Sequence, residues 1–146
     1  MYNREKDKVW VKQFDIIKSW ALSRGYSTLC YTDAGDYVDL DQKMIHIGSR
    51  QHAENRFYTL LHECGHILVA LTADKFESEH PMYAFSPDIT SRSSKAYKVS
   101  LLAEEIEAWK RGRRLALRHG LEIDNKKFDD VMTNCVMSYI NSTATG

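Results

Sequence analysis

One short stretch of the chain, His62-Glu63-Cys64-Gly65-His66, constrains its fold more than any other. Residues four apart lie on one face of an α-helix, about one turn apart, so two imidazole rings at this spacing can reach one metal ion. The surrounding positions are largely apolar: Leu60, Leu61, Ile67, Leu68, Val69 and Leu71. Three polar side chains in such a helix are costly to bury unless they are satisfied together. The stretch therefore predicts a buried helix that carries a metal site, rather than a solvated helix face with polar residues by chance.

The pattern H-E-x-x-H is also the signature of the zinc-dependent peptidases called zincins. Zinc binds neutral imidazole and carboxylate groups and keeps one coordination position for water in catalytic sites. His62 and His66 would supply two ligands. Glu63 would be the general base that takes a proton from the zinc-activated water and passes it to the leaving amine. The motif predicts a zinc metallopeptidase that hydrolyses peptide bonds, with Zn²⁺ as its cofactor.

A third protein ligand must come from another part of the chain. The metzincin pattern, with glycine and histidine after the motif, is excluded because Val69 and Thr72 occupy those positions. The other common solution is a glutamate on a following helix. The predicted helix over residues 96–119 offers Glu104, Glu105 and Glu107.

Helical spacing ranks these three glutamates. An apolar or small stripe runs at intervals of three and four residues through Leu101, Leu102, Glu105, Ala108, Trp109, Gly112, Leu115 and Ala116. Glu105 lies in the middle of this stripe, and we predict that it is the third ligand. Glu104 flanks the stripe and is the runner-up, or a partner that orients a histidine. Glu107 lies on the solvated side; pairing of all three glutamates with nearby arginines is the alternative. The small residues Ala108 and Gly112 would allow a close approach to the motif helix.

These residues resemble the ImmA/IrrE-type metallopeptidases of bacteria and phages. The resemblance covers roughly residues 43–72 and 100–117, through the H-E-x-x-H motif and the pair Glu105-x-x-Ala108. The family's second motif reads E-x-x-A-N, and here Trp109 replaces the asparagine. The resemblance implies a compact gluzincin-like domain that cuts a repressor or another regulatory protein.

The rest of the chain predicts a single α+β domain over residues 1–146, with flexible tails at 1–8 and 141–146. Helices are expected over 9–24, 51–71 (capped by Ser49), 96–119 and 125–140, and a long loop over 72–94. Three short β-prone runs at 29–31, 37–40 and 44–47 suggest an antiparallel meander.

The composition limits the expected classes of partner and the expected compartment. Lys and Arg total 20, as do Asp and Glu, so no global charge favours nucleic acid or a membrane. No apolar run approaches the roughly 18 residues of a membrane-spanning helix. The N-terminus lacks the pattern of a secretory signal. The three cysteines are odd in number, widely spaced and without a C-x-x-C pair, which suits a reducing compartment, so a cytoplasmic location is expected.

Two further hypotheses concern catalysis and partners. Zincins use a tyrosine or histidine to stabilise the oxyanion, for which Tyr97 is the candidate here, with Tyr83 and His80 as others. The expected partner is a protein or peptide substrate. The alternatives are a catalytically silent zincin-like binding protein of the antirepressor or inhibitor type, and, more remotely, a nucleic-acid module that uses the basic cluster over residues 110–118.

Overall fold

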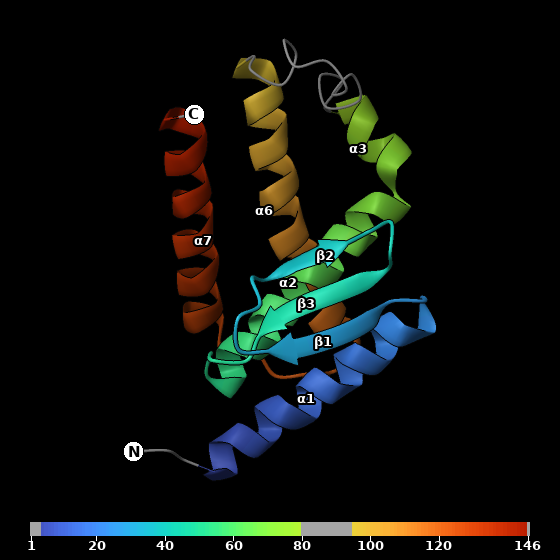
Figure 1. Cartoon of the computed structure of the whole chain (residues 1–146), viewed down its shortest axis with the longest axis vertical. Helices are drawn as coiled ribbons and strands as arrows, with labels where there is room; N and C mark the ends of the chain where they lie inside the picture. Colours follow the sequence, from blue (N-terminus) through green and yellow to red (C-terminus); the bar gives the residue numbers. More distant parts are fainter. Residues whose placement is uncertain (1–3, 80–94, 146) are drawn as a thin grey trace.

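The computed structural model describes residues 4–79 and 95–145 and confirms the α+β class (Figure 1). The elements are, in order, α1 (Arg4–Ser23), β1 (Ser27–Tyr31), β2 (Tyr37–Asp39), β3 (Met44–Gly48), α2 (Ala53–Leu71), α3 (Ala73–Glu79), α6 (Lys95–Arg118) and α7 (Asn125–Thr145). None of the helices in the described part of the chain has the length and apolarity needed to cross a bilayer.

The three strands do not form the predicted antiparallel meander. The strand order is β1-β3-β2, with β1 parallel to β3 and β2 antiparallel to it. Burial explains the difference, because β3 carries the fully buried Ile45 and Ile47, whereas β1 is mostly exposed. The most apolar strand takes the central position, where both its edges are paired, and the more polar strands take the edges.

Helix α2 is the centre of the molecule. It lies between the sheet and α1 on one side and α6 and α7 on the other (Figure 1). Its buried side chains join those of the other elements in one core, whose largest members are Ile17, Ile45, Ile47, Phe57, Tyr58, Leu60, Leu61, Ile67, Trp109 and Phe128. Each such side chain contributes about 1.5–3 kcal/mol through burial, so the helix that carries the motif is also the best-anchored element.

Helices α2 and α6 approach each other closely at two glycines. A Cβ added to Gly65 would fall well inside van der Waals contact of the carbonyl group of Ala108, and one added to Gly112 would meet the carbonyl group of Leu61. The predicted close approach through Ala108 and Gly112 is therefore confirmed. It requires glycine at one position on each helix.

Several predicted boundaries were wrong. Helix α2 begins at Ala53, after His52 rather than Ser49, and no side chain caps it. The predicted loop over 72–94 contains helix α3 in its first part; residues 80–94, with His80 and Tyr83, lie outside the described residues. Helices α1 and α7 extend into the predicted tails, to Arg4 and Thr145, because their polar sequences still have helical spacing at the ends.

Candidate metal centre

The two histidines of the motif face one another on α2. Their Nε2 atoms are 3.0 Å apart, and both rings are largely buried. The i, i+4 spacing on a regular helix produces this arrangement, since it stacks the two side chains one turn apart.

Helix α6 brings a carboxylate to the same point. Glu105 Oε1 lies 2.7 Å from His62 Nε2, and Glu105 Oε2 lies 3.3 Å from His66 Nε2. One ligand atom from each of His62, His66 and Glu105 falls within 4.8 Å of the others, so this group could hold a metal ion. The structure thus brings together the three residues predicted as ligands, while their role as ligands stays a prediction.

The runner-up Glu104 has a different place. Its Oε1 lies 2.6 Å from His66 Nδ1, on the side of the ring away from Glu105. A carboxylate at Nδ1 keeps the proton on that nitrogen and turns Nε2 toward the shared point, as partners of metal-binding histidines do. The position matches the orienting role that the sequence suggested for Glu104.

The charges of this group are strongly coupled. Burial disfavours the charged form of His66, but hydrogen bonds with Glu104 and Glu105 outweigh it and raise the pKa of His66 to about 10. Burial also opposes ionisation of Glu105, yet its hydrogen bonds with His62 and His66 hold its pKa well below the ordinary value. In the structure, His62, His66 and Glu105 therefore form a charged, hydrogen-bonded cluster.

Glu63 is the least satisfied member of the motif. It is 2% exposed, and its Oε2 has no hydrogen-bond partner among the described residues; His62 Nδ1, at 3.7 Å, is beyond hydrogen-bonding distance. Burial is the main cause that raises the pKa of this carboxyl group. A buried carboxylate without a partner costs several kcal/mol, which a nearby cation would offset. The donor set and this unsatisfied oxygen both fit a divalent metal such as zinc.

Trp109 adds a contact that sequence reasoning missed. Its ring is 1% exposed and stacks on the His62 ring, with centroids 4.1 Å apart and an interplanar angle of 5°. The stack fixes the plane of His62, much as Glu104 orients His66. The signal available in the sequence was the position of Trp109, one turn after Glu105 on the same stripe.

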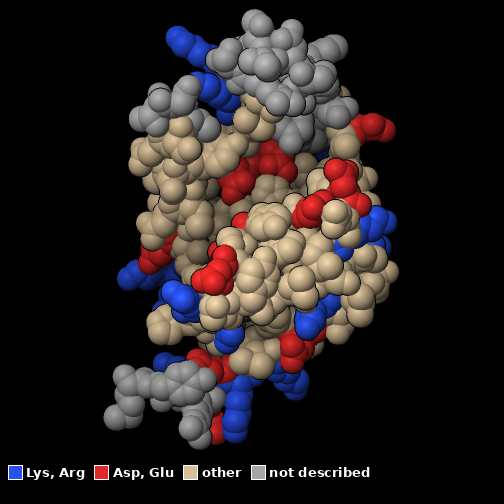
Figure 2. Space-filling model, viewed as in Figure 1, with Lys and Arg blue, Asp and Glu red and all other residues tan. Residues whose placement is uncertain are grey.

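A cavity of about 320 Å³ opens beside the histidines. Its lining comes from the loop before β2, from α2, α6 and α7, and from the residue before α2's N-cap: Asp36, Gln51, Asn55, Thr59, His62, Glu105, Trp109, Val131 and Cys135. Figure 2 shows this face of the molecule hollowed between α7 and the sheet, with acidic side chains in the hollow. Apart from His62, Glu105 and Trp109, sequence reasoning did not single out these residues. The signal was the spacing of Gln51, Asn55 and Thr59, which continues the face of the histidines.

Other candidates are outside the lining of this cavity. Tyr97 is on α6, two turns before Glu105, and is not among the residues that line the cavity, so its catalytic role stays a prediction. In the basic cluster, Arg111 contacts Glu107 (2.9 Å) and the carbonyl oxygen of Leu68 (3.0 Å), and Arg113 pairs with Asp129. Two of the cations thus serve contacts within the chain.

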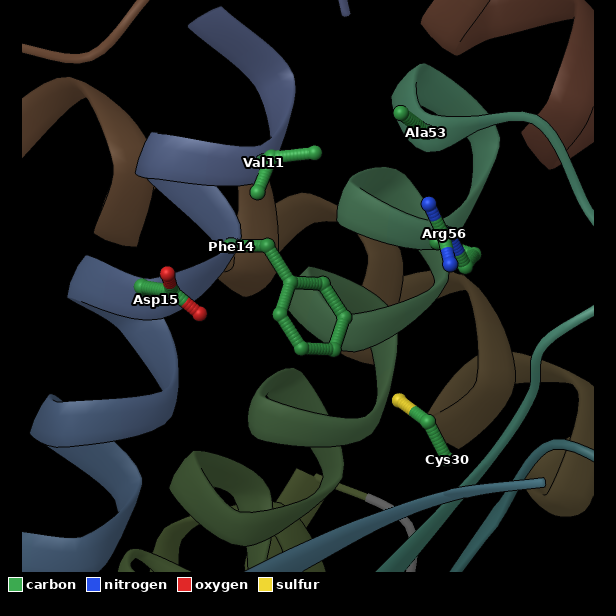
Figure 3. Close-up of a pocket in the computed structure, with 6 residues that line it drawn as sticks. All are labelled: Val11, Phe14, Asp15, Cys30, Ala53 and Arg56. Atoms are coloured by element: carbon green, nitrogen blue, oxygen red, sulfur yellow. The ribbon is translucent and has the colours of Figure 1, made fainter. Parts of the chain in front are cut away.

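A second, smaller cavity lies on the opposite side of α2. Its volume is about 190 Å³, and it is lined by Val11, Phe14, Asp15, Cys30, Ala53 and Arg56. Figure 3 shows Phe14 reaching from α1 into the space, with Arg56 and Cys30 across from it.

Comparisons with known proteins add no further constraint on the site. No family model matches the chain, and neither does any curated protein or solved structure.

Proposed function

We propose that this protein is a zinc-dependent peptidase of the gluzincin type. The observation that carries the proposal is the meeting of His62, His66 and Glu105 beside the buried, unpaired carboxylate of Glu63. The convergence of nitrogen and oxygen ligands from two helices supports a metal centre, and the adjacent carboxylate supports a hydrolytic one.

His62 and His66, through Nε2, and the carboxylate of Glu105 would hold the zinc. When bound, zinc supplies Lewis-acid chemistry: it polarises a carbonyl group and makes water more acidic. Glu104 keeps the proton on His66 Nδ1, and Trp109 holds the plane of His62. Both contacts reduce the reorganisation that metal binding demands.

Glu63 moves the proton in this mechanism. Its carboxylate takes a proton from the attacking water and donates it to the leaving nitrogen as the peptide bond breaks. The raised pKa of Glu63, caused mainly by burial, suits a group that must both accept and release a proton.

The substrate would be a protein or peptide, and a regulatory protein is the class that the ImmA/IrrE resemblance suggests. The three free cysteines suit the reducing conditions of the cytoplasm, where we place this activity.

Metal binding is tested first. Zinc per chain is measured by mass spectrometry on the wild type, Glu105→Gln and Glu104→Gln, with folding checked by circular dichroism. We expect one zinc in the wild type and none in Glu105→Gln. Glu104→Gln should still bind zinc, with affinity about 10–100-fold weaker. A wild type that takes up no added zinc would contradict the metal centre.

Peptide hydrolysis is tested with Glu63→Gln. This variant should keep its zinc but lose at least about a hundredfold in the rate of cleavage of a mixed peptide library. If the zinc-loaded wild type cleaves nothing and binds peptides as Glu63→Gln does, the protein is a silent binding protein of the zincin shape.

A further inference from the structure

The cavity beside the histidines has a chemistry that the metal centre does not explain. On the α2 side, Thr59, Asn55 and Gln51 form a ladder at four-residue spacing that leads away from His62 to Asp36. Asn55 lies about 10 Å along the helix axis from His62. If a peptide bond is held at the metal centre, the side chain of the neighbouring substrate residue can therefore reach the ladder.

Hydrogen bonds run along this ladder in one direction. Asn55 Nδ2 donates to Gln51 Oε1 (2.5 Å), and Gln51 Nε2 donates both to Asp36 Oδ1 (2.9 Å) and to the carbonyl oxygen of Gly48 (3.0 Å). Thr59 uses its single hydrogen on Gln51 Oε1 (3.0 Å) or on the main-chain oxygen of Asn55 (2.9 Å). The side chains of Gln51 and Thr59 thus use all of their donor hydrogens in hydrogen bonds within the protein.

What remains open on this wall is mainly acceptor capacity. Asp36 accepts through Oδ1 from Gln51 and from the backbone N–H of Gly48 (2.8 Å). Its Oδ2, and Oδ1 of Asn55, have no hydrogen-bond partner among the described residues. A ligand in the cavity would have to bring donors to these atoms.

The charges around the cavity also favour a ligand that brings hydrogen-bond donors. The nine residues that line the cavity include Asp36 and Glu105 but no lysine or arginine. No cation of the described residues lies within ion-pair distance of Asp36. After burial, the carboxylates of Glu105, Asp36 and Glu63 are what raise the pKa of the Cys135 thiol, so the negative field extends across to α7. Since a bound zinc would neutralise Glu105, Asp36 is the charge left for a ligand.

We propose that this cavity is the specificity pocket of the site and takes a lysine or arginine side chain of a peptide, with Asp36 as the specificity-determining residue. The inference rests on the proposed peptidase function and names its substrate class. The volume, about 320 Å³, is at the small end of ligand pockets and suits one long side chain rather than a larger ligand. Val131 of α7 provides an apolar surface for its methylene groups, and Asp36 and Asn55 accept from its charged end.

Binding is measured apart from cleavage. The protein is zinc-loaded Glu63→Gln, and the probes are fluorescein-labelled octapeptides that differ at one central position: arginine, lysine, norleucine or glutamate. Fluorescence anisotropy gives each Kd. We expect the arginine and lysine peptides to bind about tenfold more tightly than the norleucine peptide, and the glutamate peptide to bind weakest.

The charge of Asp36 is then removed. Asp36→Asn keeps an acceptor for Gly48 and Gln51, and should reduce the preference for the basic peptides to about twofold or less. Asp41→Asn is the matched control, because Asp41 is exposed in the neighbouring turn and does not line the cavity. This control should keep the full preference.

The outcomes separate the two proposals. Equal binding of all four peptides, no binding of any up to about 1 mM, or a preference that survives Asp36→Asn would overturn the specificity pocket, even if the wild type cleaves peptides. A basic preference lost in Asp36→Asn, together with a zinc-loaded wild type that cleaves nothing, would support the pocket and overturn the peptidase.

Discussion

The two cavities on either side of α2 contain similar groups but differ in how those groups are arranged. Each is lined by an aspartate, an exposed cysteine and one large aromatic side chain. In the larger cavity the polar groups meet: two histidines and a glutamate converge, and a ladder of hydrogen bonds leads to Asp36. In the smaller one, Asp15 and Arg56 form no ion pair with each other, although their charges are opposite.

Convergence of polar groups, rather than a cavity or a reactive residue type alone, therefore distinguishes a candidate site. Convergence in the larger cavity depends on the backbone contact between α2 and α6, where Gly65 and Gly112 allow the carboxylate of Glu105 to reach both histidines. The smaller cavity is formed by α1, β1 and the start of α2, and no glycine is among the residues that line it.

The largest expected effect comes from breaking that backbone contact. In Gly65→Ala, the new methyl group would collide with the carbonyl group of Ala108, so α2 and α6 must separate. We expect the free energy of unfolding, measured by urea denaturation, to fall by about 3 kcal/mol or more, with loss of zinc binding. Gly35→Ala is the control, because a Cβ there meets nothing within 4 Å, and it should change stability by less than about 0.5 kcal/mol. Equal stability of the two variants would contradict the close approach.

The charges of the larger cavity give a smaller expected effect. Although burial opposes it, hydrogen bonding to Glu104 and Glu105 raises the pKa of His66 to about 10, so metal-free His66 is protonated at pH 7. Zinc bound at the proposed site would have to displace this proton from Nε2, so its affinity should rise with pH, by up to about tenfold per unit between pH 7 and 8.5. Calorimetry in two buffers of different ionisation enthalpy should detect about one proton released per zinc.

The raised pKa of His66 also determines how the stability of the metal-free protein depends on pH. In the metal-free protein, the His66 contribution is fully present below the ordinary pKa of 6.5 and is lost as the pH rises through about 10. In Glu104→Gln, zinc binding at pH 8 should release less than one proton. The substitution weakens the hydrogen bond between residue 104 and His66, which is one of the bonds that raise the pKa of His66. Proton release that is unchanged by this substitution would contradict the assigned pairing of Glu104 with His66 Nδ1.

The smallest effect compares the two exposed thiols directly. Burial is the main cause that raises the pKa of both Cys30 and Cys135, so iodoacetamide at pH 8 should modify both more slowly than a free thiol, while the buried Cys64 stays unmodified. Glu105 adds to the shift at Cys135 only. Zinc held by the proposed site would neutralise Glu105 and should therefore speed labelling of Cys135 about twofold and leave Cys30 unchanged, as measured by mass spectrometry of the labelled peptides. Slower labelling of Cys135 would mean that the thiol itself contacts the metal.

Local spacing explains which parts of the site could be predicted. His62 and His66 are one turn apart in any regular helix, and Glu105 lies on the only stripe of its helix that can face the core. The same stripe placed Glu104 at its flank, where it meets His66. Each of these positions follows from residue spacing within a single helix.

Tertiary arrangement explains what could not be predicted. The order β1-β3-β2 depends on which strand gains most from two paired edges, and this is a competition among three short runs rather than a property of any one. Asp36 reaches the cavity because the loop before β2 passes the start of α2, and the Trp109 stack depends on the distance between two helices. Spacing within a single helix contains neither kind of information.

The way α7 is attached has a consequence for how such a protein could change over time. The buried hydroxyl group of Tyr58 on α2 donates to Glu54 (2.6 Å) and accepts from the backbone N–H of Asp124, which precedes α7 (2.9 Å). Side chains thus hold the wall that carries Val131 and Cys135, whereas backbone contact at two glycines holds the histidines and Glu105. Substitutions on α7 can reshape the wall without moving His62, His66 and Glu105, so the shape of the cavity and the arrangement of these three residues can change independently as the sequence diverges.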